Sequence, residues 1–185
     1  MERRRLLERA CAVLAAGCGA ASFARAAADP VPRLHTLAVL DVELIDEQDN
    51  PLTRAAQEAR LRNATRQLQQ ELRERRLYDV LDNAPAQALQ QRLRAQQEYL
   101  FQCEDCCDQI GRLLGAELVM ASWVQKVSEL ILNLNVQVYS VGARRIVLGK
   151  SVDMRGNADL SWTRAVSYLV REMAQRRERE PAYGL

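Results

Sequence analysis

Three closely spaced cysteines, Cys103, Cys106 and Cys107, carry the most distinctive chemistry in this sequence. In an oxidising compartment, cysteines this close together form a disulfide by default. The pair could be Cys103–Cys106 or Cys103–Cys107, and spacing alone does not choose between them. A bond between the adjacent Cys106 and Cys107 ranks last because it needs a strained peptide. Any of these pairings leaves one thiol over.

Two other uses of these cysteines compete with a structural disulfide. A C-x-x-C at a helix start could be redox-active, because the helix dipole lowers the pKa of a thiol. The intervening Glu104 and Asp105 would raise that pKa again. Thiolates also bind copper and zinc, but a closed zinc site needs four ligands, and the sole histidine is the distant His35. We therefore favour a structural disulfide and expect no metal and no cofactor, with a thiol-redox or metal-carrying protein as the alternative.

The compartment follows from the amino terminus. Residues 1–26 predict a signal peptide: a basic start, then an apolar run of about 15 residues that is too short to span a membrane, then the cleavage pattern Ala24-Arg25-Ala26. Residues 27–33 would be a linker. A lipid anchor at Cys18 is the less favoured alternative, because Ala15 stands where a larger apolar residue is usual. Either route predicts a periplasmic domain with no transmembrane segment after cleavage.

The charge balance argues against nucleic-acid binding. The chain has 185 residues and a formal net charge of +2. Residues 1–26 hold five arginines against two glutamates, so the chain without them is at −1. A nucleic-acid binder would show a basic stripe instead.

The elements that would position the cysteines form one α/β domain, residues 34–177, followed by a flexible tail, 178–185. Apolar runs and alternations predict about five strands in a small mixed sheet with helices packed on it, in the order β-α-β-α-α-β-β-β-α. The predicted strands are 34–45, 77–81, 117–127, 130–138 and 145–154. The predicted helices are 54–76, 86–99, 104 or 105–114 and 160–177, with Gly115 and Asp159 as a carboxyl-terminal and an amino-terminal cap.

Two surfaces are candidates for binding. Residues 130–138 alternate strictly, which leaves Asn133 and Asn135 on a polar face; with the nearby Gln125 and Lys126, or with an exposed sheet edge, this face could meet another envelope protein. Trp123 lies in an apolar segment, so we expect it in the core, with a place at the partner surface as the alternative. Arg155, Asn157 and Asp159 lie at a strand-to-helix junction, and a small-ligand-binding sensor using them is a second alternative. The carboxylates Asp41, Glu43 and Asp46 lie near the end of the first strand, where solvated acids are common.

Motifs for catalysis are missing from the sequence. It has no glycine-rich phosphate loop, no H-x-x-x-H and no G-x-S-x-G. We therefore expect a protein that is not an enzyme.

Several segments together resemble a family of small exported bacterial proteins of unknown function. The most specific are Cys103-x-x-Cys106, Gly115-Ala116, Trp123 to Ser128, and Arg155-Gly156-Asn157 with Ser161-Trp162. The strand order is also similar to the amino-terminal domain of TolB and its relatives among CsgG-type secretion lipoproteins and LpoB. That resemblance implies an interaction or accessory module of the cell envelope, without catalysis and with an unidentified envelope protein as partner.

Overall fold

The computed structural model describes residues 33–46, 48 and 50–185. The expected signal peptide, the lipid-anchor candidate Cys18 and most of the 27–33 linker lie outside these residues. In the described part of the chain, no helix is both long and apolar enough to cross a bilayer.

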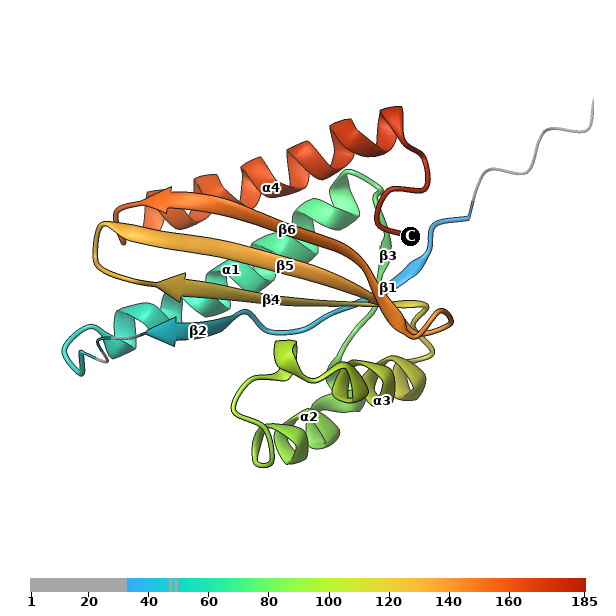
Figure 1. The fold of residues 1–185 in the computed structure, drawn as a ribbon, viewed down its shortest axis with the longest axis horizontal. Coiled ribbons are helices and arrows are strands. Elements are labelled where there is room, and N and C mark those ends of the chain that lie inside the picture. Colours follow the sequence, from blue (N-terminus) through green and yellow to red (C-terminus); the bar gives the residue numbers. More distant parts are fainter. Residues whose placement is uncertain (1–32, 47, 49) are drawn as a thin grey trace, which may run out of the picture. The chain divides into compact units, whose positions relative to one another are not determined.

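The fold is mixed α/β, as predicted, and is built on one sheet (Figure 1). Its strands in the described ranges are β1 (Thr36–Val39), β2 (Glu43–Asp46), β3 (Asp79–Val80), β4 (Leu118–Lys126), β5 (Ile131–Ser140) and β6 (Arg145–Arg155). The order is β3-β1-β4-β5-β6, with β2 also paired to β4. β1, β2 and β3 run parallel to their partners, whereas β4, β5 and β6 form an antiparallel meander.

The sheet has six strands instead of about five because the first predicted strand is interrupted. β1 and β2 both pair with β4, but the register runs from Leu37 opposite Leu118 to Glu43 opposite Trp123, so the first strand holds one extra residue. Such a bulge breaks the backbone ladder locally. The freed amide of Val42 donates to the Thr65 hydroxyl at 2.9 Å.

Helices cover the two faces of the sheet unequally. α1 (Arg54–Glu74) and α4 (Asp159–Arg179) cover one face with apolar stripes that include Leu68 and Leu169, both fully buried. α2 (Gln87–Arg94), α3 (Glu104–Leu114) and the short 3₁₀ turns η1 (Ala84–Ala86) and η2 (Leu100–Gln102) lie against the other. Figure 1 shows α2 and α3 beneath only the right-hand part of the sheet.

Two helix ends illustrate the local rules. α3 ends at Gly115, whose φ of 65° is the left-handed conformation expected of a glycine cap. α2 ends at Arg94, earlier than the predicted 99. The chain then turns so that Leu100 and Phe101 are buried against the sheet, and tertiary packing outweighs the helical preference of the glutamine-rich stretch.

The carboxyl-terminal segment, expected to be a flexible tail, packs against the domain. α4 continues to Arg179, and the chain then turns back. The Tyr78 hydroxyl donates to the Gly184 carbonyl at 2.9 Å, and Arg177 donates to the Tyr183 carbonyl at 2.8 Å. The sequence did not indicate this packing, because the Gly184 carbonyl accepts from Tyr78, which lies 106 residues away in the chain.

Candidate interaction surface

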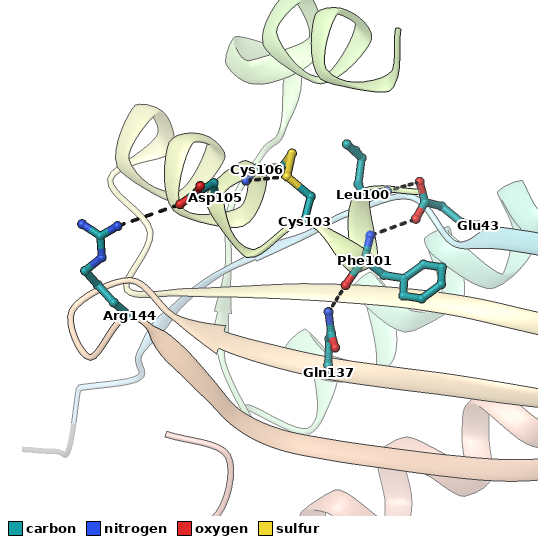
Figure 2. Close-up of a disulfide and its surroundings, with 8 residues drawn as sticks. All are labelled: Glu43, Leu100, Phe101, Cys103, Asp105, Cys106, Gln137 and Arg144. Atoms are coloured by element: carbon teal, nitrogen blue, oxygen red, sulfur yellow. Dashed lines mark hydrogen bonds and ion pairs between the residues drawn. A yellow bond between two sulfur atoms is a disulfide. The ribbon is translucent and has the colours of Figure 1, made fainter. Parts of the chain in front are cut away.

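The cysteine pair is Cys103–Cys106, one of the two pairings left open by the sequence. Cys103 is the N-cap of α3, and its sulfur accepts a hydrogen bond from the Cys106 amide at 3.1 Å. The disulfide therefore joins the end of η2 to the first turn of α3, as Figure 2 shows.

The remaining thiol, Cys107, is buried. Burial, together with the nearby Glu104 and Glu43 carboxylates, raises its pKa to about 12. A thiol with so high a pKa is protonated at neutral pH and is a poor nucleophile and metal ligand. Among residues 33–46, 48 and 50–185, no group of three or more histidine, cysteine or acidic side chains is placed to hold a metal ion.

The segment that carries the disulfide is held to the sheet by two side chains. The Glu43 carboxylate on β2 accepts from the amides of Leu100 and Phe101 at 3.0 and 3.1 Å. The Gln137 amide on β5 donates to the Phe101 carbonyl (Figure 2). Burial raises the pKa of Glu43, although the two backbone donors oppose that shift. We call Glu43, Gln137 and residues 100–106 the disulfide clamp.

The clamp places an aromatic ring beside a tryptophan. The Phe101 ring stacks on Trp123 of β4, with centroids 4.1 Å apart and planes 9° from parallel. Tyr99 packs on Phe101 at 5.4 Å. Trp123 stays half-buried, so the clamp fixes one side of its ring and leaves the rest at the edge of the uncovered sheet.

Beyond the clamp, this face of the meander is not covered by a helix in the described structure, as the left-hand part of Figure 1 shows. The strand register brings together side chains from three strands, which we call the open face: Trp123, Gln125, Ile131, Asn133, Asn135, Ser151 and Asp153. Asn133 donates to the Asp153 carboxylate at 2.6 Å. Ile131 is 58% exposed, so it adds an apolar side chain to this largely polar surface. The open face is thus mainly polar, with two apolar side chains, Trp123 and Ile131.

Lys126 does not belong to this surface, and its expected surface role is wrong. It points to the opposite face, is 0% exposed, and binds the carboxylates of Asp46 at 2.9 Å and Glu129 at 2.7 Å. Burial lowers its pKa, but the hydrogen bonds to Glu129 and Asp46 outweigh that effect and raise it. A buried ammonium needs such partners because desolvation is costly.

The junction after β6 is a structural network. The Asn157 side-chain oxygen accepts from the Trp162 indole at 2.9 Å, and its amide donates to Glu129 at 2.9 Å. Asp159 pairs with Arg60 at 2.7 Å. It was the predicted N-cap of α4, but it is the first helical residue, and Ala158 is the N-cap. Arg155 lies apart from Asn157 and Asp159, because its side chain points to the open-face side of β6, in register with Ile131. The three do not converge on one ligand.

Sequence reasoning missed the clamp residues Glu43, Phe101 and Gln137 as determinants of the surface. Glu43 stood out only as one of three acids near a strand end. Those acids in fact bind separately: Asp41 pairs with Arg94 at 3.1 Å, Glu43 holds η2, and Asp46 holds Lys126.

Comparisons place this fold among known proteins. The family model DUF3280, described as "Protein of unknown function (DUF2380)", matches residues 35–173. The solution structure of Escherichia coli LpoB is similar with a TM-score of 0.50 and 14% identity, over 82% of this chain and 84% of that one. TolB from Acinetobacter baumannii is similar with a TM-score of 0.47 and 10% identity, over 79% of this chain and 28% of that one. Lipoprotein GNA1162 from Neisseria meningitidis is similar with a TM-score of 0.47 and 13% identity, over 76% of this chain and 99% of that one. A search of curated proteins finds no match.

Proposed function

Since the chain belongs to the DUF3280 family, whose description assigns no function, we propose from its own structure that it is an exported, non-enzymatic module that binds another envelope protein. The fold is similar to that of LpoB. This similarity agrees with the TolB-like fold expected from the sequence. Export rests on the signal pattern of residues 1–26.

The open face is the observation that carries this proposal. Protein interfaces combine a few apolar or aromatic anchors with polar groups around them. Here Trp123 and Ile131 would be the anchors, and Gln125, Asn133 and Asn135 the polar surroundings. The partner would accordingly present a patch that combines polar and apolar groups.

The disulfide clamp supports this role better than a redox role. The disulfide follows Phe101 by two residues, and Phe101 stacks on Trp123 at the rim of the open face, so the disulfide would help to keep this rim rigid. A rigid anchor costs less conformational entropy on binding than a mobile one. The thiol-redox alternative has less support, because the third cysteine is buried with a pKa of about 12.

Paired substitutions test the proposal. Ile131→Asp and Asn135→Arg place charges on the open face, whereas Leu52→Asp and Gln70→Arg place the same charges on exposed positions elsewhere, Leu52 being 93% exposed. In a strain that lacks the native gene, we expect the two open-face variants to lose co-purification of one discrete envelope protein and the two controls to keep it. Equal recovery by all four variants, at equal protein levels, would contradict the proposal.

A further inference from the structure

The outer edge of β6 forms a groove with α4. β6 is the last strand of the sheet, so one side of its backbone has no strand partner in the described structure. The groove between this edge and α4 has a volume of about 670 Å³. Its walls include Lys150, Asp153 and Arg155 from β6, and Arg164, Tyr168 and Glu172 from α4.

The spacing of the α4 residues suits an extended peptide. Ser161, Arg164 or Ala165, Tyr168 and Glu172 recur every three or four residues, so they form one stripe along the helix beside the strand. A peptide added to β6 would hydrogen-bond its backbone to the strand and set alternate side chains against this stripe. Tyr168 is 46% exposed, which leaves an aromatic surface for such a side chain.

The positive charges of Arg155 and Arg164 would favour an acidic peptide in the groove. Arg155 and Arg164 are both exposed, and neither has an acidic partner within the described ranges. Lys150, by contrast, is paired with Glu172 at 2.8 Å. Two unpaired guanidinium groups favour carboxylates, which they can bind through paired hydrogen bonds.

A second copy of this chain fits the edge poorly. The antiparallel register that pairs the whole of β6 with β6 of another copy places Lys150 opposite Lys150 and Arg145 opposite Arg155. Like charges opposite one another destabilise strand pairing, and basic residues on edge strands prevent such self-association.

We propose that the groove between β6 and α4 binds an extended acidic peptide segment of a partner protein, which adds as a strand to β6 and places its carboxylates on Arg155 and Arg164. The groove shares Asp153 with the open face, but the proposed contacts are made by Arg155, Arg164 and the β6 backbone. The inference therefore extends the proposed function without depending on the anchors Trp123 and Ile131.

Anisotropy with a synthetic probe tests the inference. The probe is the fluorescein-labelled peptide Thr-Val-Thr-Ile-Thr-Val-Glu-Glu, and its matched control ends in Lys-Lys. We expect the acidic peptide to bind at least tenfold more tightly than the basic one, and more weakly as salt rises. The Arg155→Glu/Arg164→Glu variant should lose at least tenfold in affinity. Arg62→Glu/Arg92→Glu, which changes net charge equally on the exposed faces of α1 and α2, should bind like the parent.

Hydrogen exchange of the β6 backbone amides in the same complex distinguishes strand addition from electrostatic attraction without strand pairing. Alternate amides of β6 should exchange more slowly with the acidic peptide bound. Unchanged β6 amides, equal affinity for both peptides, or equal losses in the two double variants would each overturn the inference. The Asn135→Arg variant, which changes the open face opposite Ser151 and away from Arg155, should still bind the peptide, so failure of the open face and failure of the groove give different results.

Discussion

The Thr65 hydroxyl on α1 accepts a hydrogen bond from the Val42 amide at 2.9 Å, where the first strand is interrupted by its bulge. The same hydroxyl donates to the Leu61 carbonyl at 3.0 Å. Thr65 is buried, with 6% of its surface exposed. A polar residue on the core face of a helix therefore provides a hydrogen-bond acceptor for an amide that lies outside the ladder at the bulge.

Thr65→Val should destabilise the domain by about 1–3 kcal/mol, the cost of leaving a buried amide without a partner. Thr65→Ser keeps the hydroxyl and should lose about 1 kcal/mol or less. Urea unfolding followed by far-ultraviolet circular dichroism measures both. If the serine variant lost as much as the valine variant, packing of the methyl group would matter instead of the hydrogen bond.

Lys126→Met should cost about 3–5 kcal/mol, because it removes a buried cation that binds two carboxylates. Lys150→Met is the matched control, since Lys150 has one carboxylate partner and is 14% exposed at its side chain. It should cost about 1 kcal/mol. Similar unfolding midpoints for the two variants would show that the Asp46–Lys126–Glu129 cluster adds no special stability.

The pKa of Glu129 is lowered by hydrogen bonds from Lys126 and Asn157. A carboxyl whose pKa falls on folding stabilises the folded state above its ordinary value of 4.5 and loses that contribution as the pH falls below it. Thermal unfolding of the parent and of Glu129→Gln should therefore differ most above pH 5 and converge towards pH 3. A difference that stayed constant across this range would rule out the ionised carboxylate as its source.

Cys103→Ser/Cys106→Ser should lower stability by about 2 kcal/mol, the loop-closure value for so short a loop. Because Phe101, which stacks on Trp123, lies two residues before Cys103, loss of the disulfide should loosen this contact. The emission of Trp123 should then shift to longer wavelength, and its side chain should become accessible to acrylamide. Trp162 contributes a constant background because it is 4% exposed and far from the disulfide in the fold. Unaltered quenching in the variant would mean that the Glu43 and Gln137 hydrogen bonds hold Phe101 without the disulfide.

The order of elements was predictable, because each long apolar or alternating segment has one clear periodicity. The bulge was not, since Leu34 to Ile45 remains apolar on both sides of it. Thr65 was a signal: it stood on an otherwise apolar helix face. Lys126 had a signal too, because it follows Leu118, Met120 and Val124 at even spacing on the core face of β4.

The clamp could not be read from the sequence for a different reason. Glu43 holds the amides of Leu100 and Phe101, which lie 57 and 58 residues further along the chain. Local periodicity carries no information about such pairs. The same holds for the contact between Tyr78 and Gly184 that fixes the carboxyl-terminal segment.

Site-specific photocrosslinking in intact cells of the native host tests most directly whether the open face binds a partner. A photoreactive phenylalanine analogue replaces Asn135 on the open face or, as control, Gln70 on α1. We expect one discrete adduct from position 135, absent from position 70 and lost when Ile131→Asp is added. The same adducts from both positions, or none from position 135 in a protein that is exported and folded, would contradict it.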